Sequence, residues 1–432
     1  MSNWQKVTLD KLCFFEKGKT GLAKAIPGDY PLVTTSAERK TNDSYQFDTK
    51  AVCIPLVSST GHGHASLNYV HYQEGKFALG TILVALIPKD ETILNAQFLH
   101  LYLSRLKDII LVPLMSGAAN VSLSISKIKT VEIPLPPIDE QLKIVELFKN
   151  LVNENNELVE EINTQSSLLK QLKQTILQEA IEGKLTEKWR VKNPDIGTAK
   201  ELLEQIKTEK EKLIKEKKIR PSKPLSPINE DEIPFDIPPS WEWCRLGDIA
   251  NGFQYGTSTK SKINGRVPVL RMGNIQNGRV LLEELVYTDN ESEIEKYSIE
   301  YNDLLFNRTN SRELVGKTAI YSFQEKAIYA GYLIKYSMIL SNSHYINYVM
   351  NSPFHYQWCA KVRSDAIGQS NINATKLQSY IVPLPPLEEQ KEIVATIEKL
   401  FTLCNELESE INQNKTTVDN LMVTVLKESF EN

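Results

Sequence analysis

The sequence predicts an α+β fold: two mixed α/β modules, related by a pseudo-twofold axis and joined by two long antiparallel coiled-coil helices. Two observations lead to this prediction. The run PLPPIDEQ at 134–141 returns as PLPPLEEQ at 383–390, an offset of 249 residues in a chain of 432 residues. Each copy opens a long segment whose apolar residues follow a heptad spacing. A repeat of this length indicates a duplicated domain pair, because solenoid repeats are roughly 20–50 residues long.

The two heptad segments, 138–183 and 387–432, are predicted to be the coiled-coil helices. Pro137 and Pro386 lie at or just before the first turn, where the missing N–H costs nothing, and carboxylates follow both prolines at the positive end of the helix dipole. Gly183 is a plausible stop for the first helix.

The predicted seam between the helices repeats with steps of three and four residues. Its members are Phe148, Leu151, Leu158, Ile162, Leu169, Leu172 and Ile176 in the first helix, and Ile397, Leu400, Leu407, Ile411, Val418, Leu421 and Val425 in the second. Gln165 and Asn414 occupy the same slot in the two helices, and we expect them to fix the register. Two separate amphipathic surface helices remain an alternative, although the shared unbroken register favours mutual antiparallel packing.

The rest of the chain divides into two modules, 1–137 and 240–386, and a connector, 184–239. In the connector, a capping box at 198–201 opens a charged helix, and six prolines between 221 and 239 then predict an extended segment. Its Lys-rich run is more readily explained as a solvated helix face than as a DNA contact.

Both modules are predicted to mix strands and helices. Apolar strand-like runs occur at 51–57, 81–87 and 267–270, and helical patterns occur at 95–110 and 341–362. The modules open alike, with tryptophan and aliphatic residues at an offset of 237, but their interiors diverge strongly. A shared frame with divergent interiors implies two different ligands or two different target sequences.

Composition limits the class of protein. A hydrophobic content of 41% and a charged content of 24% are typical of a globular protein. The net charge of −4 and a pI near 6.0 exclude a wholly basic nucleic-acid binder but not a local basic face. The five cysteines lack paired spacing, which favours a reducing compartment over a zinc site or disulfides. With no apolar run of about 20 residues and no signal-peptide pattern at the start, we expect a cytoplasmic protein without a membrane partner.

Catalytic motifs are missing. The run DIPP at 236–239 only superficially resembles the Asn/Asp-Pro-Pro-aromatic site of an adenine methyltransferase. No Gly-x-Gly-x-x-Gly loop follows a strand, and the phosphate-loop ending at 316–318 has Ser311 where the earlier glycine is required. His62 and His64 have no third metal ligand nearby. The sequence therefore predicts a binding protein without catalytic or metal sites, whose partners would carry out any reaction.

Polar loops of both modules are suited to double-stranded DNA. Arginine pairs with guanine and asparagine with adenine, whereas serine and threonine suit phosphates. The predicted DNA-binding residues are Ser36, Arg39, Lys40, Ser58, Thr60, His62 and His64 in the first module, and Arg271, Asn274, Asn277, Arg308, Thr309, Asn310, Arg312, Lys317 and Asn371 in the second. An ordinary polar turn is the alternative for any single loop.

Several motifs together resemble the specificity subunits of type I restriction-modification systems. The duplicated PLPPxxEQ openings and the run QEAIEGKLT at 178–186, followed by Trp189-Arg190, are similar to the conserved regions of that family. The runs RTNS at 308–311 and ELVGK at 313–317 resemble one class of its target recognition domains. The resemblance covers essentially the whole chain.

The resemblance implies a DNA sequence-specificity subunit without catalysis of its own. Modules 1–137 and 240–386 would be target recognition domains, each reading one half of a bipartite asymmetric site. The coiled coils would set the spacer and dock two methyltransferase subunits, which carry S-adenosylmethionine, and restriction subunits that use ATP and Mg could join. This chain would bind no cofactor. A coiled-coil DNA-binding scaffold or regulator without a methyltransferase partner is the alternative.

Overall fold

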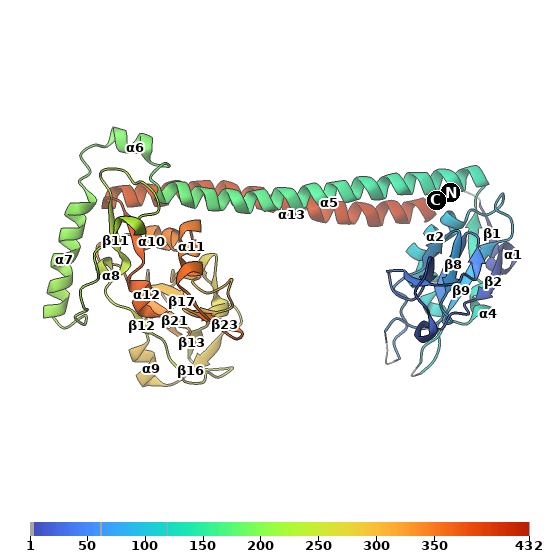
Figure 1. Ribbon diagram of the computed structural model, residues 1–432, viewed down its shortest axis with the longest axis horizontal. Helices are drawn as coiled ribbons and strands as arrows, with labels where there is room; N and C mark the ends of the chain where they lie inside the picture. Colours follow the sequence, from blue (N-terminus) through green and yellow to red (C-terminus); the bar gives the residue numbers. More distant parts are fainter. Residues whose placement is uncertain (1–3, 61–62, 119, 432) are drawn as a thin grey trace. The chain divides into compact units, whose positions relative to one another are not determined.

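The computed structural model describes residues 4–60, 63–118 and 120–431, with side chains described as far as 418 and at 420 and 421. The chain divides into two compact units, 1–163 with 412–432, and 164–411. Each unit contains one module and parts of both long helices, α5 (Ile138–Ile181) and α13 (Leu387–Glu431) (Figure 1). Within the described residues, no helix is both long and apolar enough to cross a membrane.

In the described part of the first module there are ten strands, with short helices between them. Its elements are β1 (Gln5–Thr8), α1 (Leu9–Leu12), β2 (Cys13–Lys17), η1 (Leu22–Lys24), β3 (Tyr30–Val33), β4 (Lys40–Asn42), β5 (Phe47–Asp48), β6 (Ala51–Pro55), β7 (His71–Gln73), β8 (Lys76–Leu79), β9 (Leu83–Pro88), α2 (Ala96–Arg105), α3 (Lys107–Ile110), η2 (Val112–Leu114), α4 (Ile125–Lys129) and β10 (Glu132–Leu135). One sheet has the order β2-β9-β6-β7 and another the order β4-β3-β8-β5. Strands β6 and β9 are the apolar runs predicted from the sequence, and they lie in the core because side chains on both of their faces are buried.

The second unit adds the connector and the second module. Its elements are α6 (Glu187–Lys192), α7 (Ala199–Lys215), η3 (Glu230–Glu232), β11 (Glu242–Arg245), α8 (Leu246–Ile249), β12 (Gln254–Tyr255), β13 (Val267–Leu270), η4 (Met272–Asn274), β14 (Ile275–Gln276), β15 (Gly278–Val280), β16 (Val286–Thr288), α9 (Glu291–Lys296), β17 (Leu304–Asn307), β18 (Thr309–Asn310), β19 (Thr318–Ile320), β20 (Ile328–Tyr329), β21 (Leu333–Tyr336), α10 (Ser343–Val349), α11 (Pro353–Val362), β22 (Ser364–Ala366), β23 (Gln369–Asn371), α12 (Ala374–Gln378) and β24 (Ile381–Leu384). The helical pattern at 341–362 forms two helices, because Ser352 caps and Pro353 begins α11.

The same strand frame occurs in both modules. The first strand pairs antiparallel with the last, as β1–β10 and as β11–β24. The antiparallel order β2-β9-β6 corresponds to β12-β21-β17, and the parallel pair β3–β8 corresponds to β13–β20. The modules differ in what extends this frame: β7 in the first, and β19, β15 and β14 in the second. The two modules therefore share their central strand pairing although their interior sequences differ. The α+β prediction is confirmed.

In the second unit, the two long helices run antiparallel. Lys173 Nζ, in α5, donates to Asn405 Oδ1 at 3.0 Å and pairs with Glu408 Oε2 at 2.7 Å in α13. Thr186, just beyond the end of α5, donates to Glu389 near the start of α13 at 2.7 Å. Positions that increase along one helix thus decrease along the other, as predicted.

The buried line between the helices corrects half of the predicted seam. Five residues at one heptad position of the seam are buried as expected: Ile162, Leu169, Ile176, Ile397 and Val418. Four other seam residues, Phe148, Leu151, Leu400 and Ile411, are partly buried. In the alternate slot, Leu158, Leu172, Leu407 and Leu421 are exposed, as are Gln165 and Asn414. In α5, the partly buried positions lie one residue further along, at Val159, Ser166 and Lys173. The side chain of Val425 lies outside the described residues. Both Leu158 and Val159 are apolar, so spacing alone could not choose between steps of three and four residues.

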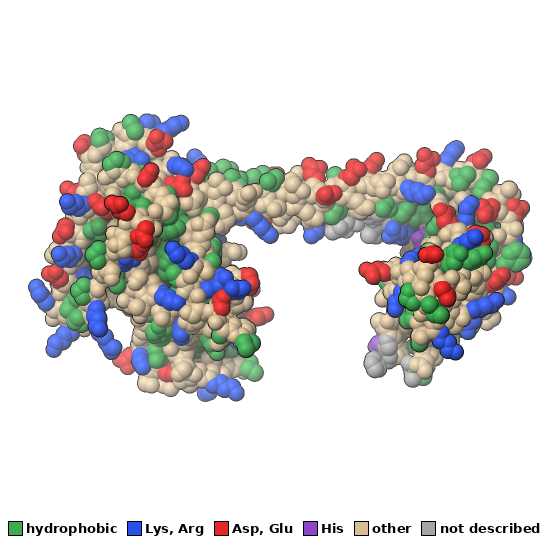
Figure 2. Space-filling view, in the orientation of Figure 1, with side chains coloured by type: hydrophobic (Ala, Val, Ile, Leu, Met, Phe, Trp, Pro, Cys, Tyr) green, Lys and Arg blue, Asp and Glu red, His purple; other side chains and the backbone are tan. Residues whose placement is uncertain are grey.

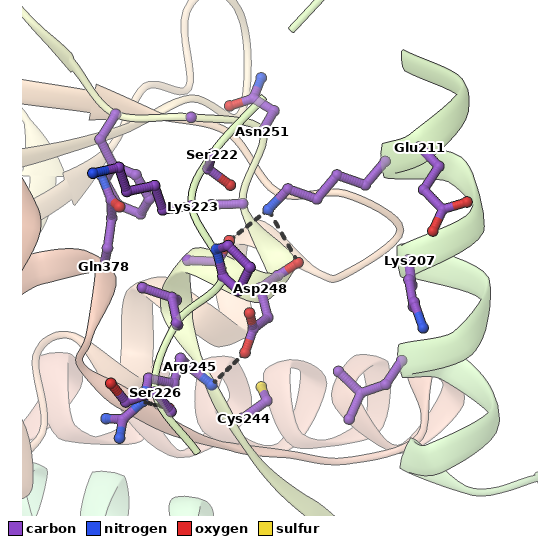
Figure 3. A pocket seen from close by; sticks show the side chains of 18 of the residues that line it. Lys207, Glu211, Ser222, Lys223, Ser226, Cys244, Arg245, Asp248, Asn251 and Gln378 are labelled. Atoms are coloured by element: carbon purple, nitrogen blue, oxygen red, sulfur yellow. Dashed lines mark hydrogen bonds between the residues drawn. The ribbon is translucent and has the colours of Figure 1, made fainter. Parts of the chain in front are cut away.

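The connector packs against the second module. The capping box predicted at Thr198 and Glu201 is present. The proline-rich segment contains no helix beyond η3, and Arg245 holds it there by donating to Glu232 at 2.8 and 2.9 Å and to Ser226 O at 2.8 Å. Lys210 Nζ donates to Gly247 O, and both residues line a cavity of about 710 Å³ between α7 and the module. Figure 3 shows this cavity from close by. Burial lowers the pKa of this amine, so part of the Lys-rich face is structural.

Candidate nucleic-acid interface

The glutamine that ends each repeated motif fixes its module to the first turn of a long helix. Gln141 is fully buried; its Oε1 accepts from Asn95 N at 2.8 Å, and its Nε2 donates to Ile93 O and Pro136 O at 2.8 Å. Gln390 is also fully buried, accepts from Asn342 N at 2.8 Å and donates to Pro385 O at 2.9 Å. Each asparagine caps the following helix, α2 or α10. The two motifs therefore perform the same structural task in both units.

The preceding glutamate binds the tryptophan at the start of its module. Trp4 Nε1 donates to Glu140 Oε2 at 3.1 Å in the exposed first copy, and Trp241 Nε1 donates to Glu389 Oε2 at 2.8 Å in the second. Glu389 is fully buried and also pairs with Arg190 at 2.9 Å, in addition to the bond from Thr186. The motif at 178–190 thus joins the end of α5 to the start of α13 within the second unit.

In each module, a polar loop pairs with the segment that precedes a short helix, which is α4 in the first module and α12 in the second. In the first module, Leu123 N donates to Leu56 O at 2.9 Å and Ser58 N to Val121 O at 3.0 Å. In the second, Ile372 N donates to Arg308 O at 2.9 Å, and β18 pairs with β23. The positions 123 and 372 differ by the same 249 residues as the repeated motifs. Both modules therefore join a polar loop to the segment before α4 or α12, and this joined surface is the candidate interface.

In the second module, two of the predicted arginines lie at this surface. The guanidinium of Arg308 stacks over the ring of Tyr255 at 4.7 Å. Arg312 is mostly exposed and pairs with Asp365 at 2.8 Å, and Arg363 pairs with the same carboxylate at 3.2 Å. Stacking and pairing hold these cations in fixed positions, an arrangement that suits a polyanionic ligand.

The other predicted residues of this module divide by exposure. Arg271 and Asn277 are exposed, and Arg271 donates to Glu284 O at 2.7 Å. Asn274 is 4% exposed, because its amide donates to Leu281 O and Glu283 O and accepts from Arg271 N; it closes the loop from inside and presents nothing to a ligand. This corrects its predicted role.

Three further predicted residues are tied to their neighbours. Thr309 is buried and accepts from Asn371 Nδ2 at 2.7 Å, which joins β18 to β23. Lys317 donates to Gln276 at 2.8 Å, and burial lowers the pKa of its amine. Asn310 is partly buried and accepts from the next backbone N–H. These side chains shape the surface and leave Arg271, Arg308 and Arg312 as the better candidates for contacts.

In the first module, Arg39 is a structural residue. Its guanidinium donates to Gln73 Oε1 at 3.0 Å, Tyr72 O at 3.2 Å and Ala37 O at 3.3 Å. Burial and the neighbouring Arg39 lower the pKa of His71 to about 4, so the neutral ring can accept from the arginine, 3.1 Å away. Four of the five N–H groups of this guanidinium have partners within the module, which gives Arg39 a structural role in place of the predicted contact.

The remaining predicted residues of the first module lie in or near exposed loops. Ser36 and Lys40 are exposed. Ser58 donates to His64 O at 2.6 Å, and Thr60 bonds to Ser66 at 2.8 Å, so the loop is closed by hydroxyl groups. His64 is exposed, and His62 lies outside the described residues.

The sequence reasoning missed most of the hairpin formed by β22 and β23. Asn371 was the only one of its residues to be predicted as a site residue. Short polar strands around a glycine turn, at 364–371, were the available signal. It was weak because strands of three residues resemble any polar loop.

A cysteine and a histidine approach each other inside the second module. Cys359 Sγ lies 3.3 Å from His355 Nε2, which also contacts Gly316 O at 2.9 Å. Both residues are buried; burial raises the pKa of the thiol and lowers that of the imidazole to about 4. A protonated, enclosed thiol is not an available nucleophile, so this pair is a core contact.

Comparison with known proteins agrees with this construction. The chain is 31% identical over 299 residues to the type I restriction enzyme EcoAI specificity subunit of Escherichia coli, a match that covers 66% of this chain and 49% of the relative. It is 23% identical to the EcoDI specificity subunit of Escherichia coli, over 99% of this chain and 88% of the relative. The chain spans about half the length of the first curated relatives it matches.

Solved structures show the same fold. A chain from a study of complex assembly and conformational transition of the type I R-M system matches with a TM-score of 0.66 at 17% identity, covering 100% of this chain and 98% of that one. The HsdS subunit from Thermoanaerobacter tengcongensis matches with a TM-score of 0.56 at 16% identity, covering 99% and 97%. The family model for the type I restriction modification DNA specificity domain matches residues 1–165 and 238–414, most of the chain. The chain therefore belongs to the type I restriction-modification DNA specificity family.

Proposed function

We propose that this chain is the DNA-recognition subunit of a type I restriction-modification complex. Each module reads one half of a bipartite asymmetric site, and the two long helices set the spacer between the halves. The matched construction of the two modules carries the proposal: each joins a polar loop to the segment before α4 or α12, and a buried glutamine fixes each module to the first turn of a long helix. Two linked recognition modules gain affinity when both bind at once.

The long helices also supply a surface for partner subunits. Large apolar side chains that are 43–58% exposed follow one side of each helix; they are Leu147, Leu158, Leu168 and Leu172 in α5, and Leu403, Leu407 and Leu421 in α13. In each helix they occupy two heptad positions that are four residues apart and therefore neighbour each other on the helix surface, so they form a stripe beside the buried line. Figure 2 shows hydrophobic side chains on the surface of the long helices. We name these seven residues the leucine stripe and propose that it docks helices of two methyltransferase subunits.

Chemistry comes from those partners. The methyltransferase subunits bind S-adenosylmethionine and modify adenine, and restriction subunits, where present, use ATP and Mg to translocate and cleave DNA. This chain contributes only the recognition of the DNA sequence and the spacing between its two halves. Comparable half-site readers place their binding elements about one helical turn of DNA apart.

Binding measurements test the proposal. The purified chain with a methyltransferase subunit should retard a duplex carrying the mapped methylation site far more strongly than a scrambled duplex. We expect the affinity to fall steeply with salt, because phosphate contacts release counterions. Equal binding of the two duplexes at every salt concentration would refute sequence recognition.

Charge in the leucine stripe should block assembly without unfolding the chain. We expect Leu158→Asp with Leu172→Asp to keep the wild-type free energy of unfolding, because both side chains are exposed. The same variant should fail to co-purify with the methyltransferase subunit and should lose methylation, because a docked charge would be buried without a partner. Asn156→Asp, on the exposed opposite side of α5, is the control. Normal co-purification of the double variant would show that the stripe is not the docking surface.

Arg312 should contribute directly to the second half-site. Arg312→Ala is expected to cost roughly 1–3 kcal/mol of binding free energy and to relax preference at one base position, if the guanidinium contacts a base edge. A residue that contacts only phosphate would weaken all sequences equally and lower the salt slope by about one. Competition among single-base variants of the target measures the difference. Full retention of affinity and preference would remove Arg312 from the site.

A further inference from the structure

The hairpin at 364–371, which we call the ribbon, carries an apolar side chain at its tip. Ala366 pairs with Gln369, so the turn consists of Ile367 and Gly368, with a glycine φ of +80°. Residues 364–369 are all exposed, and Ile367 is 105% exposed. The turn requires the glycine but not the isoleucine, since polar residues suit such positions better in water. This tip therefore presents an aliphatic group for contact.

The ribbon is held rigidly. Asp365 accepts from Ser370 at 2.6 Å and from Arg312 and Arg363 at 3.0 and 3.2 Å. The hydrogen bond from Ser370 and the nearby arginines hold the pKa of this carboxyl below its ordinary value, so it stays ionised at neutral pH. Lys376 Nζ donates to Ser364 at 2.9 Å, and β23 pairs with β18. A preorganised element of this kind loses little conformational entropy when it binds.

The size and charge of the ribbon fit a DNA major groove. Strands of three residues rise roughly 10 Å at about 3.3 Å per residue, comparable to the groove depth of about 8.5 Å. A major groove admits a two-stranded β ribbon. The cations Arg312, Arg363 and Lys376 outnumber the carboxylates Asp365 and Glu313 around the base of the ribbon. Such an excess suits the phosphates that line the groove.

We propose, on the basis of the function proposed above, that the ribbon enters the major groove of the second half-site and reads A·T base pairs there. Ile367 contacts the 5-methyl group of a thymine, which is an apolar feature of that groove. Gln369 is exposed and directly follows the turn, and its amide pairs with N6 and N7 of an adenine. The ribbon is thus a specificity element built from the segment that immediately precedes α12.

Base analogues test the thymine contact in the unmodified protein. Duplexes carrying the mapped site receive deoxyuridine in place of thymidine, one position of the second half-site at a time. Bound by the full chain with a methyltransferase subunit, one such duplex should lose about fourfold in affinity, the effect of one buried methyl group. In Ile367→Ala this loss should disappear, because the side chain that senses the methyl is gone. Ile263→Ala is the matched control: it removes another exposed isoleucine of the same module and should leave the loss intact.

Gln369 is tested in the same way with 7-deazaadenine, which lacks the N7 acceptor. Gln369→Ala should weaken binding at least about fivefold and should abolish sensitivity to the analogue at one position. Insensitivity of the wild-type complex to both analogues throughout the half-site would overturn the inference. Sequence-specific binding would persist in that case, so the proposed function would stand; loss of all target preference in the wild type would instead refute the function. Weaker association of Ile367→Ala with the methyltransferase in the absence of DNA would make the tip a protein contact and would also overturn the inference.

Discussion

An Ile397→Asp chain should lose at least about 4 kcal/mol of unfolding free energy, because a charge would replace a fully buried aliphatic side chain. Ile397 packs in one core with residues from the last turns of α5 and from the second module. The variant should therefore destabilise the helix pair and the module together. Chemical denaturation followed by tryptophan fluorescence measures the loss.

Leu407→Asp is the matched control on the same helix. Leu407 was predicted to lie in the same seam, but it is 48% exposed, so its replacement should change stability by no more than about 0.5 kcal/mol. The contrast distinguishes the observed buried line from the predicted one. Equal destabilisation by both variants would restore Leu407 to the seam.

Glu389→Ala should have the second large effect on stability. The carboxylate is fully buried, and it accepts from Trp241, Thr186 and Arg190 at 2.7–2.9 Å. Its removal leaves a guanidinium that is 20% exposed without its anion, at a cost of about 3–5 kcal/mol. The chain's own repeat provides the control, because Glu140 binds Trp4 in an exposed setting.

Glu140→Ala should cost less than about 1 kcal/mol in the same denaturation experiment, since only one hydrogen bond in contact with water is lost. If the two glutamates proved equally important, the burial difference between the two copies would not govern their strength. If neither replacement lowered the free energy of unfolding, the contacts between the end of α5 and the start of α13 would not stabilise the protein.

The sequence predicts the frame of this protein well because the frame depends on local chemistry. Both long helices begin directly after the repeated prolines, at Ile138 and Leu387, and the capping box opens α7. Apolar runs on two faces predicted the central strands β6 and β9. In each case, a backbone preference or a burial pattern acts within a few residues, so one sequence is sufficient.

Features that depend on packing could not be predicted. The choice between Leu158 and Val159 at the buried line is set by the neighbouring helix, because both side chains are apolar. Asn274 and Arg39 were predicted as contacts from their residue types, but the amide of Asn274 closes its own loop and the guanidinium of Arg39 bonds to β7. The ribbon was missed because its two strands gain their stability from β18, which is distant in sequence. Polar residues of these kinds close loops as readily as they bind ligands.

Exchange of one module tests the central claim most directly. Residues 240–386 are replaced by the second module of another family member, and the methylated sites of a strain carrying the hybrid are mapped. The account predicts that only one half of the bipartite site changes, while the other half and the spacer length are retained, because each module makes its own contacts and the helices are untouched. A change in both halves, or in the spacer, would contradict separate reading by two modules on a fixed helical frame.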